Sequence, residues 1–321
     1  MLKKKRWMKI GIGFLVTLLI INIIASFYFY DLAIKREQKD FLQDNDDLVV
    51  STDAMDVFLR GGWREWIDNQ DFEYWEMQSF DDLRLQGYYL EAEKPTDKTV
   101  IFAHGYLGRA RDMGLYGQHY YEDLGYNMLT VDLRGHGQSE GDYIGFGWHS
   151  RLDMLDWIER VIEEQGKDSE IVLHGLSMGA ATVLMTSGED LPDQVQAIVA
   201  DSSYTSVYDL FDYQMSRMFN LPSFPILPTT SLVTQAKSDF SLKEASALDQ
   251  VKKAELPILY FHGRNDDFVP TRMAKELYNN TNSDATIKTF DESSHGEAFA
   301  IYREEYINVL NQFLKQHINE E

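Results

Sequence analysis

The stretch Gly-Leu-Ser-Met-Gly at residues 175–179 constrains the fold of this chain more than any other. An apolar run, Ile171–Leu173, precedes it, and a run of small and apolar residues, Ala180–Leu184, follows it. This order predicts a buried strand, a sharp turn and a helix, with the hydroxyl of Ser177 exposed above a sheet. The two glycines suit such a turn because a Cβ at either would collide with the neighbouring strand and helix. The helix N-terminus would face Ser177, where its N–H groups favour developing negative charge.

The length and composition exclude several classes of function. The 321 residues suffice for one large α/β domain or two ordinary ones. The formal net charge of −22 argues against nucleic acid as a partner, because phosphate binding needs clustered Lys and Arg. The absence of cysteine excludes disulfides, thiol catalysis and cysteine-ligated metals.

Residues 1–30 form a segment distinct from the rest of the chain. An apolar run, Ile10–Tyr30, would span about 31 Å as a helix, which matches the core of a bilayer. Its only polar members are Thr17, Asn22 and Ser26. We expect an uncleaved signal anchor rather than a cleavable signal peptide, because the run is long and lacks a good small-x-small cleavage site. The basic residues before the run predict a cytoplasmic N-terminus and an extracytoplasmic domain at the cell membrane; they are Lys3, Lys4, Lys5, Arg6 and Lys9.

The anchor is followed by a polar, acidic juxtamembrane segment over residues 31–70. Short helices are expected here, with a break at Gly61 and Gly62. Trp63 and Trp66 lie one helical turn apart, and we expect them to pack onto the following domain, with contact to the membrane surface as the alternative. Residues 71–321 are then predicted to form the main domain.

The main domain alternates strand and helix patterns. The expected strands are Phe72–Met77, Leu83–Leu90, Thr99–Ala103, Asn127–Asp132, Glu170–Leu173, Ala197–Ala200, Pro257–Phe261 and Ala285–Phe290. The first two nearly alternate in polarity and predict an antiparallel pair at one sheet edge, and the others predict a mainly parallel, doubly wound α/β sheet. The expected helices are Trp148–Gln165, with Leu152, Leu155, Ile158 and Ile162 on its apolar face, and an amphipathic closing helix, Ala298–His317.

One interval, about residues 205–250, interrupts this alternation. It carries no strand pattern and contains three prolines, so we expect a small helical cap over the carboxyl edge of the sheet. Met215, Met218 and Phe219 either line an apolar substrate pocket or pack the cap onto the core, and the sequence leaves both interpretations open.

Partners for Ser177 are expected at the carboxyl ends of the other strands. Asp266 and Asp267 follow the strand that ends at Phe261, and His295 follows the last strand. A histidine can accept the proton of an attacking serine, and a carboxylate can hold its imidazole in the required tautomer. Asp201, after another strand, is a more remote choice of acid. The chain order serine, aspartate, histidine is that of α/β-hydrolases.

From residue 72 to the C-terminus, the sequence resembles the α/β-hydrolase superfamily, and within it bacterial serine hydrolases described as esterases, lysophospholipase-like proteins or S33-type peptidases. The motifs that carry the resemblance are His104-Gly105-Tyr106, the stretch from Asp132 to Ser139, the serine turn, the stretch from Gly263 to Pro270, and Ser294-His295-Gly296. Motifs in this order are specific for the fold and say less about the substrate.

The resemblance implies roles for individual residues. It favours Asp266 over Asp267 as the acid, since the acid lies four residues before Pro270. It implies an oxyanion hole formed by the backbone N–H groups of Tyr106 and Met178. The remaining motif histidines are expected to be structural; they are His104, His136, His174 and His262. No histidine spacing matches a metal site, so neither a metal nor another cofactor is expected.

These observations favour a membrane-anchored serine hydrolase, most simply a carboxylesterase that acts on small-molecule or lipid-like acyl esters through an acyl-Ser177 intermediate. An amidase or peptidase of the same fold is the first alternative, since His295 could also protonate an amine leaving group. A non-catalytic binding protein that retains the fold is the second. The chain order of Ser177, Asp266 and His295 argues against that second alternative.

Overall fold

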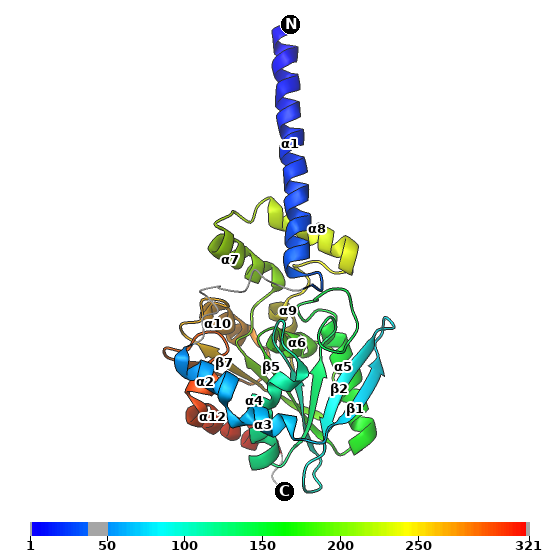
Figure 1. Cartoon of the computed structure of the whole chain (residues 1–321), viewed down its shortest axis with the longest axis vertical. Coiled ribbons are helices and arrows are strands. Elements are labelled where there is room, and N and C mark those ends of the chain that lie inside the picture. Colours follow the sequence, from blue (N-terminus) through cyan, green and yellow to red (C-terminus); the bar gives the residue numbers. More distant parts are fainter. Residues whose placement is uncertain (1, 38–50, 319–321) are drawn as a thin grey trace.

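The computed structural model describes residues 2–37 and 51–318, and its centre is an eight-stranded sheet with helices on both faces (Figure 1). The strand order is β1-β2-β4-β3-β5-β6-β7-β8. Only β2 runs against its neighbours, so the expected antiparallel pair at one edge is confirmed, and all other pairings are parallel. The strands are β1 Glu73–Gln78, β2 Arg84–Leu90, β3 Lys98–Ala103, β4 Asn127–Asp132, β5 Glu170–Leu176, β6 Val195–Asp201, β7 Ile258–Gly263 and β8 Ala285–Phe290.

Helices and short helical turns connect the strands and cover both faces of the sheet. Alternate residues of the central strands enter two apolar layers, one shared with α5, α6 and α10 and the other with α3, α4 and α12. The α-helices are α1 Leu2–Ala33, α2 Thr52–Arg60, α3 Gly62–Asp68, α4 Gly114–Gln118, α5 Ser150–Gln165, α6 Met178–Thr186, α7 Val207–Phe219, α8 Ile226–Ser238, α9 Ala247–Val251, α10 Thr271–Asn280, α11 Ala298–Ile301 and α12 Arg303–His317. A 3₁₀-helical turn, η3 Ala110–Met113, precedes α4, and a π-helical turn, η4 His119–Asp123, follows it.

Two helix predictions need correction. The buried face of α5 is formed by Met154, Trp157, Ile158 and Val161. The predicted Leu152, Leu155 and Ile162 are only half-buried. The face of α5 that packs on the sheet is instead centred on Trp157, whose ring lies over Gly87. A Cβ on Gly87 would come within 2.9 Å of that ring.

The predicted closing helix is divided into α11 and α12 at Tyr302. This residue leaves the helical conformation, with φ −114° and ψ 38°. Its ring stacks on Phe290 at 5.5 Å, and its hydroxyl donates a hydrogen bond to the carbonyl of Asp291. The residue at which the helix breaks is therefore the one that contacts the end of β8.

The juxtamembrane segment packs on the domain where it is described. The break between α2 and α3 lies at Gly61, as predicted. Trp63 is buried and donates its indole N–H to the carbonyl of Val57, and Trp66 packs against the ring of Tyr121. Both tryptophans therefore pack on the protein. Residues 38–50 of the predicted segment lie outside the described residues, and the division of the chain at residues 30 and 70 stays a prediction.

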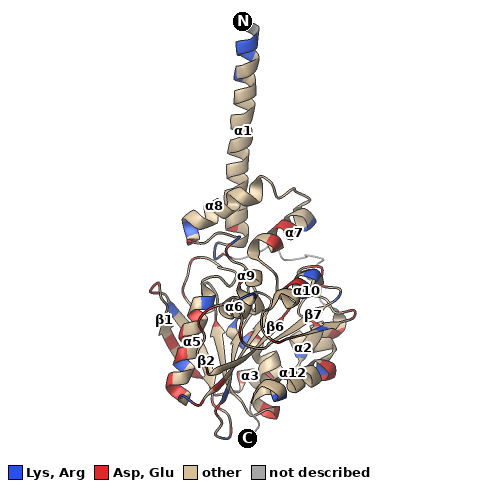
Figure 2. Ribbon diagram, turned by 180° about the vertical axis from the view of Figure 1, so that it is seen from behind, with Lys and Arg blue, Asp and Glu red and all other residues tan. Residues whose placement is uncertain are grey.

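Helix α1 projects from the domain at the side of α7 and α8 (Figure 1). Figure 2 shows basic residues near its N-terminal tip and an uncharged shaft below them. From Lys4 to Ala33 the helix is long and apolar enough to cross a membrane. Helices α7, α8 and α9 occupy the interval in which a helical cap is expected, and α7 and α8 lie on either side of the lower end of α1 (Figure 1).

Candidate active site

Ser177 lies at the sharp turn between β5 and α6. Its backbone has φ +54° and ψ −113°, a conformation that costs a non-glycine residue about 1–3 kcal/mol. The turn is closed by two glycines. A Cβ on Gly175 would lie 2.2 Å from the carbonyl oxygen of Gly179, and a Cβ on Gly179 would lie 1.9 Å from that of Ala103. Only glycine fits at both positions, as the sequence predicts.

The tertiary structure brings Ser177, His295 and Asp266 together in one hydrogen-bonded chain. The hydroxyl of Ser177 lies 2.8 Å from Nε2 of His295, and Nδ1 of His295 lies 2.7 Å from Oδ2 of Asp266. Ser177 follows β5, Asp266 follows β7 and His295 follows β8, so the ends of three strands supply the three groups, with β6 lying between β5 and β7. This arrangement can deprotonate a serine and hold the resulting imidazolium.

The carboxylate of Asp266 is buried and fully engaged. Its Oδ1 accepts hydrogen bonds from the backbone N–H groups of Phe268 (3.0 Å) and Val269 (2.7 Å). Its Oδ2 faces both His295 and Nε2 of His262, the latter at 3.2 Å. Burial alone would raise the pKa of Asp266, but the two histidines outweigh it and hold this pKa well below its usual range. The site therefore contains a carboxylate that stays ionised.

His262 is a site residue that the sequence reasoning assigned only to the turn. Its Nε2 lies 2.8 Å from the carbonyl of Val269 as well as close to Asp266. Burial lowers the pKa of His262, and the hydrogen bond and charge of Asp266 raise it by more, so the net direction is upward. The i, i+4 spacing of a strand-end histidine and an aspartate was the available sequence signal.

The two rival acids lie away from His295. Asp267 is exposed and pairs with Arg217 at 3.0 Å. Asp201 is buried and accepts hydrogen bonds from the hydroxyls of Tyr116 (3.2 Å) and Tyr306 (3.1 Å). Neither carboxylate is bonded to the imidazole.

Tyr106 and Met178 flank the serine as the predicted oxyanion-hole residues. Met178 is the first residue of α6, a position whose N–H has no acceptor within the helix. A Cβ on Gly105 would lie 3.5 Å from the Cβ of Ser177, which places the loop leading into Tyr106 beside the serine. The ring of Tyr106 stacks on Phe146 at 5.1 Å. Both backbone segments therefore lie next to Ser177.

Two other motif histidines are bonded to loops around the site, and a third is buried in β5. Nε2 of His104 accepts the N–H of Leu133 at 3.1 Å, and Nε2 of His136 accepts the N–H of Leu107 at 3.3 Å. His174 lies in the buried layer beneath the sheet, where burial lowers its pKa to about 3. Their bonds and burial match the expected structural roles. Within residues 2–37 and 51–318, no cluster of three or more His, Asp or Glu could hold a metal ion.

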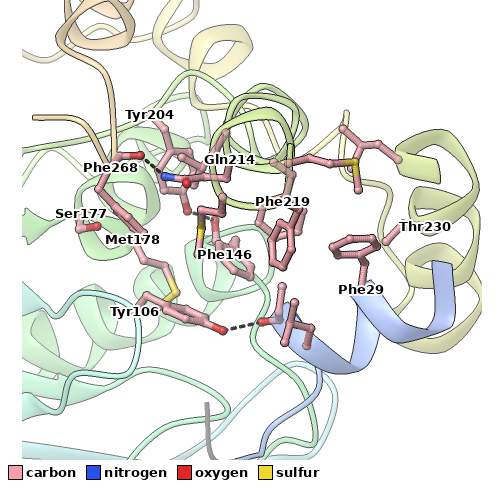
Figure 3. A pocket seen from close by; sticks show the side chains of 17 residues that line it. Phe29, Tyr106, Phe146, Ser177, Met178, Tyr204, Gln214, Phe219, Thr230 and Phe268 are labelled. Carbon is pink, nitrogen blue, oxygen red and sulfur yellow. Dashed lines mark hydrogen bonds between the residues drawn. The ribbon is translucent and has the colours of Figure 1, made fainter. Parts of the chain in front are cut away.

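An apolar pocket that is partly open to solvent begins at Ser177 (Figure 3). Met215, Met218 and Phe219 of α7 line it, and Met215 is also buried in the core, so the two interpretations of the cap residues both hold for this side chain. Almost all of the lining is apolar; it comprises Phe29, Leu32, Ala33, Tyr106, Phe146, Ser177, Met178, Tyr204, Leu210, Phe211, Gln214, Met215, Met218, Phe219, Leu227, Thr230 and Phe268. Such a pocket suits a hydrocarbon chain beside the serine.

The strand order, the serine turn and the order of site residues define an α/β-hydrolase fold. A sequence model of the family described as alpha/beta hydrolase fold matches residues 98–230. The chain has the α/β-hydrolase fold, and the resemblance drawn from its motifs is confirmed at that level.

Relatives of known sequence extend over most of the chain. It is 26% identical to YqkD of Bacillus subtilis over 310 residues, which cover 95% of this chain and 96% of that protein. It is 24% identical to the lysophosphatidylserine lipase ABHD12 of Rattus norvegicus, over 83% of this chain and 63% of that one.

Solved structures of similar fold include a Pyrococcus furiosus esterase, Pf2001, and a Pyrococcus horikoshii acylaminoacyl peptidase. The esterase has a TM-score of 0.63 and 23% identity over 79% of this chain and 93% of its own. The peptidase has a TM-score of 0.59 and 18% identity over 80% of this chain and 43% of its own. These solved structures share the fold of this chain.

Proposed function

We propose that this protein is a serine carboxylesterase that cleaves acyl esters through an acyl-Ser177 intermediate. The observation that carries the proposal is the hydrogen-bonded chain from Ser177 through His295 to Asp266 at the end of an apolar pocket. His295 accepts the proton of Ser177 during attack and returns it to the leaving alcohol. Water, activated by the same imidazole, then releases the acid product.

The backbone N–H groups of Met178 and Tyr106 stabilise the oxyanion of the tetrahedral intermediate in this proposal. Loss of one such donor typically lowers the rate by about a hundred- to a thousandfold. Asp266 holds the tautomer of His295 and stabilises its imidazolium, and the ionised state of its carboxylate supports this role. The apolar lining and the lipase name of one relative support an ester with a hydrocarbon acyl group.

The proposal is tested by hydrolysis of p-nitrophenyl esters by the full chain in detergent micelles. Ser177→Ala should lower turnover at least about 10³-fold and abolish labelling by a fluorophosphonate, because both need the nucleophile. Ser203→Ala is the matched control, since its buried hydroxyl has no hydrogen-bond partner among the described residues and does not line the pocket. Turnover that survives in Ser177→Ala would contradict the proposal, and labelling without ester turnover would direct attention to amides.

We further propose that α1 anchors the protein in the cell membrane with the hydrolase domain outside. Lys and Arg before the apolar run support a cytoplasmic N-terminus. On the far side, the guanidinium of Arg36 donates to the carbonyls of Gly137 and Ser139, so this charge has a role within the domain. Protease added to intact cells should degrade the domain and spare a tag at the N-terminus, and full protection of the domain would contradict this orientation.

A further inference from the structure

The lower part of α1 is bonded to the cap through the polar residues of its apolar run. The side-chain amide of Asn22 donates to Thr229 Oγ1 at 2.7 Å, and the hydroxyl of Ser26 lies 3.3 Å from the carbonyl of Ile226. One more turn along, the hydroxyl of Tyr30 lies 2.8 Å from that of Ser238. The three cap residues bonded to α1 all belong to α8, so α8 packs along this face of α1.

The same face of α1 continues into the pocket. Phe29, Leu32 and Ala33 line it, and the ring of Phe29 meets that of Phe219 edge to face at 5.2 Å. The hydroxyl of Tyr106 donates to the carbonyl of Ala33 at 2.7 Å, which ties α1 to the loop beside the serine. Figure 3 shows Ser177 at one end of the pocket and Phe29 near the other.

The contacts with the cap begin within the apolar run of α1. From Asn22 to Tyr30 the helix axis advances about 12 Å at 1.5 Å per residue. When the run spans the hydrocarbon core of a bilayer, about 30 Å thick, this part lies among the acyl carbons of the leaflet farther from the N-terminus and ends at the boundary with the headgroups. The cap at that depth exposes apolar side chains, with Phe224 77% and Leu232 70% exposed. Amphipathic helices at a membrane interface bury such residues in the lipid.

From this geometry we infer that α1 forms a wall of the acyl pocket as well as an anchor, and that the pocket takes a long acyl chain from the bilayer. The substrate class is a membrane-resident amphiphile with a long-chain acyl ester, whose hydrocarbon end lies beside Phe29 and Leu32. This inference rests on the proposed function for its chemistry. Binding of the acyl chain in the pocket needs no turnover and is tested separately.

Binding of the acyl chain in the pocket is measured on full-length Ser177→Ala protein in lipid nanodiscs. The probe is an alkylglycerol ether with a hexadecyl chain and a terminal photoreactive diazirine, which the enzyme cannot hydrolyse. We expect cross-links on Phe219 of α7, which lines the pocket and whose ring meets that of Phe29 at the end of the pocket where the diazirine would lie. Leu32→Trp should fill the pocket and remove these cross-links, whereas Leu19→Trp, at a position 57% exposed and outside the pocket lining, should keep them.

Chain-length selectivity is measured with palmitoyl and butyryl esters on proteins that retain Ser177. Leu32→Trp should lower the palmitoyl-to-butyryl ratio of kcat/KM by about tenfold or more, because lost hydrophobic contacts in a pocket cost this much. Phe29→Ala should lower the same ratio, while Phe27→Ala, outside the pocket lining of the same helix, should leave it unchanged.

The two measurements separate the two proposals. Absence of the α7 cross-links, or their persistence in Leu32→Trp, would overturn the role of α1 whether or not esters are hydrolysed. An equal fall of both ester rates in Leu32→Trp would also overturn it. Cross-links with the expected pattern in a chain that hydrolyses no ester would retain the pocket and reject the proposed esterase activity.

Discussion

At the scale of single residues, the site depends on one strained serine and one ionised carboxylate. Ser177 holds a positive φ because the flanking glycines let β5 and α6 approach closely. Asp266 accepts two backbone hydrogen bonds on one oxygen and faces two imidazoles with the other. His262 contacts the carboxylate and not the serine in this arrangement, and we propose that it positions Asp266.

Asp266→Asn should lower kcat for ester hydrolysis by about 10⁴-fold, because an amide favours the wrong tautomer of His295. Asp267→Asn is the matched control: Asp267 is exposed and bonded to Arg217, so kcat should stay unchanged. Both variants are assayed with the same p-nitrophenyl ester. A larger loss in Asp267→Asn than in Asp266→Asn would show that the acid has been misassigned.

At the scale of elements, the loop after β4 is held by a buried cation. Arg134 is 1% exposed and binds Asp153 through two nitrogens at 2.6 Å and Asp81 at 2.9 and 3.0 Å. Asp153 lies on α5, and Asp81 lies between β1 and β2. The guanidinium therefore ties α5 and the connection between β1 and β2 to the loop after β4, which is bonded to His104 and Leu107.

Arg134→Met should lower the free energy of unfolding by about 3–5 kcal/mol, because it leaves two carboxylates without their cation. Arg160→Met is the control: Arg160 is 40% exposed in its ion pair with Glu164, so its loss should cost about 0–1 kcal/mol. Denaturant titration of the full chain in micelles measures both. Equal losses in the two variants would contradict the role of the buried cation.

At the scale of the whole molecule, buried histidines make stability depend on pH. Burial lowers the pKa of His136 and His174 to about 3 and that of His149 to about 4. In the unfolded chain these groups titrate near about 6.5. Between those values the unfolded chain binds more protons than the folded one, so stability falls as pH falls.

We therefore expect the denaturant midpoint of the full chain to decrease from about pH 7 to about pH 5. His149→Gln should reduce this slope, since glutamine retains an acceptor for the hydroxyl of Tyr143, which lies 2.6 Å from Nδ1 of His149, without a titrating group. The midpoint is followed by tyrosine and tryptophan fluorescence at each pH. A midpoint that is constant or rises on acidification would contradict this account.

The sequence by itself determined the features that depend on local sterics and order along the chain. The serine turn follows from two glycines between an apolar strand and a helix of small residues, and the order of the motifs predicts the α/β-hydrolase fold. Strand positions are predictable for the same reason, since buried strands need continuous apolar runs. Catalytic roles for Ser177, Asp266 and His295 stay predictions, although the structure brings all three together.

Only the tertiary structure decided which distant segments meet. The contact of His262 with Asp266, the break at Tyr302 and the entry of α1 into the pocket each depend on packing between elements. The sequence pattern of an apolar helix does not distinguish a helix that faces lipid from one that lines a pocket, because both environments favour hydrocarbon side chains. Asn22 and Ser26 show why the fold was needed: their polar groups find partners on a cap some two hundred residues away.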